Sequence, residues 1–245
     1  MKTSTTIPHA DADEQSELLR IRAAYARRKK LMSAERYLRT NPGHLYSLHE
    51  REVTMASLLR RIGLSSLSGL RILDLGCGRG STLRLLLEYG ADPDLLFGID
   101  LMEDHVQVAH ALSPNMHFSC GSTTRLPYAD ASFDLILQFL LFTSVLSDAA
   151  RSRIAMEISR VLSPGGHFLW YDFAYNNQTN PDVRGIRLSE IWQLFSGFTI
   201  EARRVTVAPP FGPFGRALGR LGPSAYYLAS QLRLLSTHYF CLLKT

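Results

Sequence analysis

Three glycines at alternating positions follow a short hydrophobic run, and this stretch constrains the fold more than any other. The run is Ile72–Leu75, and the glycines are Gly76, Gly78 and Gly80. Such a run is typical of a buried parallel strand, and a helix is predicted to begin near Ser81. A strand, a glycine-rich turn and a helix N-terminus bring backbone N–H groups close to a ligand. The stretch therefore predicts a ligand-binding α/β domain.

The hydrophobic pattern alternates between strands and helices along the rest of the chain. Strands are expected at 71–75, 95–100, 116–120, 133–138, 166–171, 198–207 and 238–243, and helices at about 81–89, 103–111, 149–161 and 189–195. This alternation predicts an α/β, Rossmann-like fold with a doubly wound, mostly parallel seven-stranded sheet whose last strand is antiparallel. Ligands of such sheets bind beyond the carboxyl ends of the strands.

The segments that flank this core predict the domain organisation. Residues 1–15 are polar and are expected to be a disordered tail. Residues 16–65 are expected to form an N-terminal helical cap over the ligand-binding edge, with one helix at about 16–38, a turn at 41–43 and a second helix that follows to about residue 61. Residues 66–245 are expected to form the main domain. Its helical insertion at about 209–235, before the last strand, is predicted to act as a lid.

The charge and the cysteines narrow the possible partners and compartment. The net charge is +5, and the basic run Arg27–Lys30 is typical of a solvated helix face; contact with a phosphate or an anionic membrane surface is the alternative. This mild charge predicts no nucleic-acid partner. Cys77, Cys120 and Cys241 fit neither a zinc site nor a disulfide framework, which favours reduced thiols and a cytoplasmic protein without a membrane span. The oligomeric state stays open.

Four segments between residues 70 and 173 together resemble one enzyme family. Asp74 and the three glycines are similar to motif I of the class I S-adenosylmethionine (SAM) methyltransferases, and Asp100 ends the next strand. Residues 121–134 resemble the family's G-D-A-x-x-L-P-F-x-D-x-S-F-D segment, and residues 161–166 resemble its R-V-L-K-P-G-G turn. The type 11 (UbiE-like) small-molecule methyltransferases resemble the chain most. Another Rossmann nucleotide-binding domain is the alternative, although its glycine spacing differs.

The resemblance implies SAM as cofactor and assigns its contacts residue by residue. Asp74 would hold the amino group directly or through water, Asp100 would bind the ribose hydroxyls, and Leu101 would pack on adenine. The remaining implied contacts are Gly76, Gly78 and Gly80 along the methionyl and ribose parts, Cys77 as steric filling, Ser122 and Thr123 near the adenine amine, and Gln138 near the methionyl backbone. The family often has Asp where this chain has Ser122, so a hydroxyl must replace that contact.

Polar residues near the end of the fifth strand and the start of the last are candidates for acceptor chemistry. Asp172, Tyr171 and His238 are the catalytic candidates, Asp172 and His238 as bases; structural hydrogen bonds are the alternative for Asp172 and His238. The substrate-contact candidates are Tyr175, Asn176, Asn177 and Arg184. Pairing with Asp182 or Glu190 is the alternative for Arg184. No metal is expected, although Asp172 with Asn176 or Asn177 would imitate a metal-assisted site.

These expectations combine into a predicted enzyme. It would transfer a methyl group in line from SAM to a small-molecule acceptor, with a hydroxyl of a sugar, glycolipid or secondary metabolite favoured. The segment Gln138–Phe142 lacks the D/N-P-P-Y/F, paired-glutamate and Pro-Cys signatures of nucleic-acid and protein-arginine enzymes. The alternatives are N- or C-methylation of a metabolite, or a non-catalytic SAM-binding partner protein.

Overall fold

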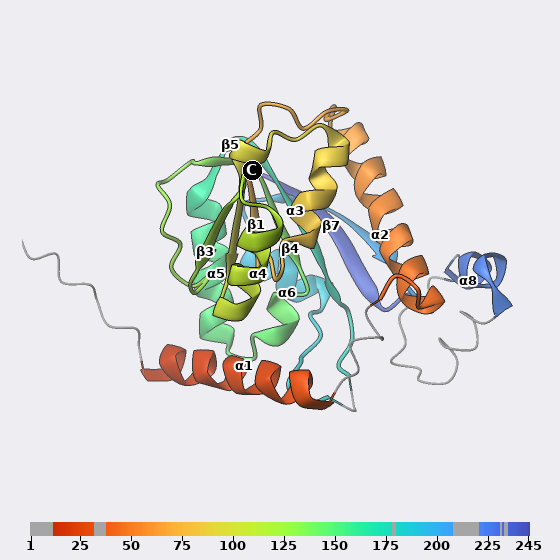
Figure 1. Cartoon of the computed structure of the whole chain (residues 1–245), viewed down its shortest axis with the longest axis horizontal. Coiled ribbons are helices and arrows are strands. Elements are labelled where there is room, and N and C mark those ends of the chain that lie inside the picture. Colours follow the sequence, from red (N-terminus) through yellow and green to blue (C-terminus); the bar gives the residue numbers. More distant parts are fainter. Residues whose placement is uncertain (1–11, 32–37, 178–179, 208–220, 231, 233–234) are drawn as a thin grey trace, which may run out of the picture.

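The computed structural model describes residues 12–31, 38–177, 180–207, 221–230, 232 and 235–245 (Figure 1). Seven strands form one sheet in the order β3-β2-β1-β4-β5-β7-β6. They are β1 (Ile72–Leu75), β2 (Leu96–Asp100), β3 (His117–Cys120), β4 (Phe133–Phe139), β5 (Leu162–Phe173), β6 (Thr199–Val205) and β7 (His238–Lys244). Strands β1 to β5 pair in parallel, and β7 runs antiparallel to both β5 and β6. This confirms the predicted Rossmann-like sheet with its antiparallel last strand.

Helices cover both faces of the sheet. The described helices are α1 (Ala12–Leu31), α2 (Pro42–Arg61), α3 (Ser81–Leu86), α4 (Glu103–Leu112), α5 (Asp148–Val161), α6 (Leu188–Leu194) and α8 (Pro223–Ser230). Helices α2, α3 and α4 contribute buried side chains to one hydrophobic core, and α5 and α6 contribute to the other. Helix α1 lies across the end of the sheet beside α5 (Figure 1).

The N-terminal helix differs from the sequence expectation at both ends. It begins at Ala12, so residues 12–15 are helical rather than part of a tail. Asp13 and Glu14 lie in its first turn, where their negative charge interacts favourably with the positive end of the helix dipole. The helix ends at Leu31, and Leu38 lies in a bend rather than in a helix. Residues 32–37 lie outside the described residues.

The fifth strand begins earlier than expected. Leu162 already pairs with Phe133, and the register shifts before the pair of Leu135 and His167. The expected turn before the strand is therefore an irregular part of β5 itself, with Gly165 at φ +76°. In the predicted insertion, α8 is helical over Pro223–Ser230, whereas residues 209–220 lie outside the described residues.

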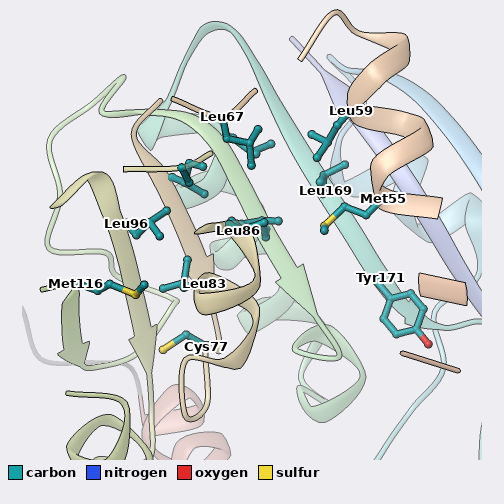
Figure 2. Packing of buried hydrophobic residues seen from close by; sticks show 14 of the residues in the cluster. Met55, Leu59, Leu67, Cys77, Leu83, Leu86, Leu96, Met116, Leu169 and Tyr171 are labelled. Atoms are coloured by element: carbon teal, nitrogen blue, oxygen red, sulfur yellow. The ribbon is translucent and has the colours of Figure 1, made fainter. Parts of the chain in front are cut away.

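Alternation along β5 decides which face each side chain occupies. Leu169 and Tyr171 face α2, and Figure 2 shows Leu169 packed beside Met55 and Leu59 of that helix. Trp170 belongs to the core on the opposite face. Successive side chains of a strand point to opposite faces. Asp172 therefore lies on the Trp170 face, away from Tyr171.

Among the described helices, none combines the length and apolar character that crossing a bilayer requires.

Candidate functional site

The glycine turn after β1 needs glycine for its backbone and for its packing. Gly76, Gly78 and Gly80 have φ values of +70°, +53° and +74°, in the left-handed region that other residues rarely adopt. A Cβ at Gly80 would lie 2.9 Å from the Phe118 ring. At Gly78 a Cβ would meet nothing within 4 Å. The turn thus leaves open space at Gly78, on the side where a ligand would approach.

Cys77 fills space beneath the next strand. A Cβ at Gly98 would lie 2.8 Å from the Cys77 Sγ. Burial raises the pKa of the Cys77 thiol well above its usual range, which keeps the thiol protonated.

Asp100, at the end of β2, holds the glycine turn in place. Its Oδ2 accepts a hydrogen bond from the Gly78 N–H at 2.8 Å, and its Oδ1 accepts one from the Met102 N–H at 2.8 Å. His105 Nδ1 lies 3.6 Å from Oδ1. Because a carboxylate has about four lone-pair sites, Asp100 keeps acceptor capacity for the two hydroxyls of a ribose.

A cavity of about 240 Å³ lies beyond the carboxyl ends of β1 to β4. Of the cofactor contacts expected from the sequence, those that line it are Gly76, Asp100, Leu101, Ser122 and Thr123. Those that do not are Asp74, Cys77, Gly78, Gly80 and Gln138. The rest of the wall includes Phe139 at the end of β4, the segment after β4 with Leu141, Ala150 and Ile154 of α5, and α1.

Helix α1 supplies a wall of the cavity that the motifs did not reveal. Its lining residues are Glu14, Glu17, Leu18, Ile21 and Tyr25. Their spacing of i, i+3, i+4 and i+7 places them on one helix face. That periodicity was the available signal, but it did not show what the face would cover.

Buried hydrogen bonds fix α1 to the segment after β4. Glu17 Oε1 accepts from the backbone N–H groups of Leu146 at 2.5 Å and Ser147 at 3.3 Å. Arg20 pairs with Glu17 at 2.7 Å and donates to the Ser144 carbonyl at 2.6 Å. These contacts hold the helix over the cavity.

Further ion pairs attach α1 at both of its ends. Glu14 pairs with Arg153 of α5 at 2.6 Å and accepts from the Thr124 hydroxyl. In the basic run, Arg27 pairs with Asp182 at 2.7 Å and Lys29 pairs with Asp104 at 2.9 Å. Arg28 lies over the Tyr25 ring, 5.1 Å from its centroid, so three of the four basic side chains make contacts within the described residues.

Polar groups gather on the α2 face of the sheet, next to the cavity. The guanidinium of Arg51 lies over the rings of Phe139 and Tyr171, 4.8 and 5.5 Å from their centroids. Asp74 lies fully buried on the same face. Burial raises the pKa of Asp74 to about 8, against the opposing charge of Arg51. Phe139 also lines the cavity, so cavity and polar groups adjoin at this ring.

Tyr171 and His238 lie together, as two of the three catalytic candidates. Their rings stack with centroids 4.6 Å apart. The Tyr171 hydroxyl donates to Thr206 Oγ1 at 3.0 Å. Burial, aided by the charge of Arg51, lowers the pKa of His238 to about 3, so the imidazole is neutral at neutral pH.

Thr206 connects these residues to α2 and α8. Its φ of +63° is an outlier for a β-branched residue, and such strain concentrates at functional sites. Glu50 Oε1 accepts from the Thr206 N–H at 3.0 Å, and Glu50 Oε2 accepts from the Tyr226 hydroxyl at 3.0 Å. We call Glu50, Arg51, Tyr171, Thr206 and His238 the Arg51 cluster. No sequence motif marked Glu50, Arg51 or Thr206.

Asp172 does not join the other two catalytic candidates. It is fully buried on the α5 and α6 face, where it accepts from the Thr143 N–H at 3.0 Å and the Phe173 N–H at 2.9 Å. Burial raises its pKa to about 7, and these two hydrogen bonds oppose that rise. The geometry is that of a structural carboxyl that holds the segment after β4. Gln138 lies on the same face and accepts from the Leu141 N–H at 3.0 Å.

The predicted substrate-contact residues lie apart from the Arg51 cluster. Tyr175 is about half exposed and lies against Arg204, whose guanidinium donates to its hydroxyl. Asn176 Oδ1 accepts from the Gly185 N–H at 3.0 Å. Asn177 accepts at its backbone carbonyl from the Asn180 N–H at 3.1 Å.

Arg184 adopts the alternative pairing raised by the sequence. It pairs with Glu190 at 3.0 Å and with Asp148. Glu190 also pairs with the buried Arg151 at 2.5 Å. Arg184 is thus part of an ion-pair network that links α5 and α6. Among the described residues, no group of three or more His, Cys, Asp or Glu side chains is placed to hold a metal ion.

Comparison with known proteins decides the family. Residues 73–170 match the family model described as a methyltransferase domain of type 11. A demethylmenaquinone methyltransferase of Leptospira interrogans is 30% identical over 172 residues, which cover 67% of this chain and 66% of that protein. The chain belongs to the class I SAM-dependent methyltransferases.

Other methyltransferases match over smaller parts or by fold alone. A chicken tRNA N(3)-cytidine methyltransferase is 27% identical over 112 residues, covering 42% of this chain and 30% of that protein. The chain matches only 30–48% of the length of the first four curated relatives. A SAM-dependent methyltransferase of Mesorhizobium loti shares the fold, with a TM-score of 0.58, 22% identity and coverage of 77% and 96% of the two chains.

The residues around the cavity fit SAM, the cofactor of this methyltransferase family. The cofactor carries a nucleoside, a sulfonium and an amino acid. Asp100 offers carboxylate acceptors to a ribose, and the open space at Gly78 admits a ligand against the backbone.

Proposed function

We propose that this methyltransferase transfers the methyl group of SAM to a hydroxyl of a small molecule. One observation carries the proposal: Phe139 belongs both to the wall of the cofactor cavity and to the base of the Arg51 cluster. An acceptor bound at the cluster would therefore face the methionyl end of the cofactor. Both sites lie beyond the carboxyl ends of the parallel strands, where ligands of such sheets bind.

The proposed cofactor contacts are those that the family resemblance assigns. Asp100 would accept from the ribose hydroxyls, and Ser122 and Thr123 would lie at the adenine. Leu101 would pack against the adenine ring, and Asp74 would neutralise the amino group. The wall formed by α1 would exclude water from the bound cofactor.

The reaction depends mainly on how the acceptor oxygen is positioned relative to the methyl group of SAM. When bound, SAM supplies an electrophilic methyl group. Holding an acceptor oxygen in line with it contributes up to about 7–11 kcal/mol in well-oriented reactions. We assign Tyr171 and His238 to the acceptor side of the site and Asp172 to the support of the segment after β4. The lid proposal for residues 209–235 is supported by α8, because Tyr226 bonds Glu50 and packs on Tyr46.

Radiolabel transfer from methyl-labelled SAM tests the proposal. A cell extract would be separated into small polar molecules, lipids, nucleic acid and protein after incubation with the enzyme. We expect label among the small polar molecules or lipids, and none with Gly78→Arg, because that side chain would occupy the open space at the turn. Label only in nucleic acid or protein would contradict the proposal. SAM binding without transfer would favour a non-catalytic SAM-binding protein.

A further inference from the structure

In the described part of the chain, the guanidinium of Arg51 contacts aromatic rings and forms no ion pair with a carboxylate. It stacks on Phe139 and Tyr171 on the α2 face of the sheet. Within the described part of the chain, it makes neither a hydrogen bond nor an ion pair. Burial lowers the pKa of Arg51 from its usual value, although the side chain remains partly exposed. A partly buried guanidinium without a partner in the described residues leaves its N–H donors open to a ligand.

Two other arginines show that stacking alone does not leave a guanidinium unpaired. Arg71 also lies over two aromatic rings, and its Nε donates to the Ser132 carbonyl at 3.0 Å. Arg204 lies over two rings as well and donates to the Ser236 carbonyl at 3.1 Å. Only Arg51 of these three keeps all its donors unused among the described residues.

The position of Arg51 separates it from the cofactor cavity. Phe139 lines the cavity, whereas Arg51, Tyr171 and His238 do not. Tyr171 and His238 lie on β5 and β7, on the far side of β4 from the glycine turn. The guanidinium of Arg51 thus lies on the side of Phe139 that faces away from the cofactor cavity, where the acceptor is proposed to bind. Asp74, the acid on this face, has its pKa raised to about 8 by burial and neutralises Arg51 only in part at neutral pH.

We propose that Arg51 binds the acceptor as an oxyanion, so that the substrates are molecules with an acidic aromatic or enolic hydroxyl. This inference rests on the proposed methyl transfer and narrows its acceptor class. A guanidinium presents several N–H groups to an oxyanion while its plane stays stacked on aromatic rings. The neighbouring rings of Tyr171 and His238 suit a planar acceptor. An ordinary sugar hydroxyl is too weak an acid to ionise there.

Ionisation against Arg51 removes the need for a base during the reaction. The hydroxyl proton leaves to solvent as the acceptor binds. The oxygen then forms its bond to the methyl carbon while the methyl–sulfur bond breaks, and that electron pair remains on sulfur. A mechanism without a base fits the two base candidates, because Asp172 lies on the other face of the sheet and His238 is a very weak base.

The absorbance of para-nitrophenol tests the inference, since its anion absorbs visible light and its neutral form does not. The probe would be titrated with pH in the presence of the enzyme saturated with S-adenosylhomocysteine. We expect the bound probe to ionise about one pH unit or more below the free probe. Arg51→Gln should abolish this shift and weaken probe binding about tenfold. Arg51→Lys should restore part of both, because it keeps the charge.

Matched measurements separate this inference from the proposed function. Arg71→Gln removes another stacked arginine, at the opposite end of β1, and should leave the probe unaffected. If Arg51→Gln instead weakens SAM about tenfold and spares the probe, Arg51 binds the cofactor carboxylate and the inference is wrong. Equal pKa values for free and bound probe, or no binding of the probe, would also overturn it. Failure of the unaltered enzyme to bind SAM would contradict the proposed function itself.

Discussion

The rings of Tyr171 and His238 lie parallel, with 3° between their planes and 4.6 Å between their centroids. One ring comes from β5 and the other from the start of β7, and the two strands pair antiparallel. The stack therefore joins the end of the parallel part of the sheet to the strand that follows α8. It also places a neutral imidazole in the interior of the domain.

The burial of His238 predicts a stability that depends on pH. The unfolded chain protonates this histidine near pH 6.5, whereas the folded protein does so only near pH 3. Between these values the unfolded state binds more protons, so stability rises with pH. We expect His238 to lower the free energy of unfolding by about 2 kcal/mol at about pH 5 relative to about pH 7.5. Urea denaturation at the two pH values should show less difference in His238→Gln, and an unchanged difference would contradict a buried neutral imidazole.

Asp74 predicts proton release when SAM binds. Its pKa of about 8 leaves it largely protonated at neutral pH, whereas pairing with the cofactor's ammonium group favours the carboxylate. Calorimetry in buffers of different ionisation enthalpy should reveal release of up to one proton, and affinity should rise as pH increases toward about 8. Asp74→Asn should remove the buffer dependence. The same proton release in that variant would point to another group.

We expect substitution of Asp100 to lower the affinity for the cofactor without unfolding the domain. Asp100→Ala removes one hydrogen bond to the glycine turn, one to the Met102 N–H and the proposed ribose contact. We expect SAM to bind at least about tenfold more weakly, because charge-assisted hydrogen bonds contribute about 1.5–3 kcal/mol each. The control is Asp130→Ala, whose carboxyl is largely exposed and pairs with Arg160. Equal SAM affinity in both variants would show that the assignment of Asp100 is wrong.

We expect the contacts of Glu17 to set the rate at which the cofactor dissociates. Glu17→Ala would leave the N–H groups of Leu146 and Ser147 without their partner, and each such loss costs about 1–3 kcal/mol when buried. The dissociation of S-adenosylhomocysteine should become at least several-fold faster. Stopped-flow displacement measures this rate, with the exposed Glu88→Ala as control. An unchanged rate would mean that α1 does not retain the cofactor.

The core of the fold could be predicted because its signals are local. The central strands β1, β2, β4 and β5 carry hydrophobic runs, and the glycine turn needs backbone conformations that only glycine adopts easily. Asp100 could be predicted for the same reason, since it ends a recognisable strand next to that turn. These features depend on residues that are close in sequence, so they can be recognised without knowledge of the tertiary structure.

The Arg51 cluster could not be predicted in the same way. Glu50 and Thr206 form a hydrogen bond although they are 156 residues apart in the sequence. No local sequence pattern predicts a contact of this range. Tyr171 and Asp172 were both named as catalytic candidates, but they could not share one site, because adjacent residues of a strand point to opposite faces. The apolar neighbours Phe168 and Trp170 share the Asp172 face, and this alternation was visible in the sequence.

The contacts of α1 have a consequence for the order of folding. Its partners Asp104, Thr124, Leu146, Arg153 and Asp182 all lie at least 75 residues further along the chain. During synthesis α1 leaves the ribosome before these partners, so it has nothing to dock on until β4 and α5 have been made. Contacts of such long range form late, because the intervening chain must be ordered first. We therefore expect α1, although it is synthesised before its partners, to be among the last elements to take its place.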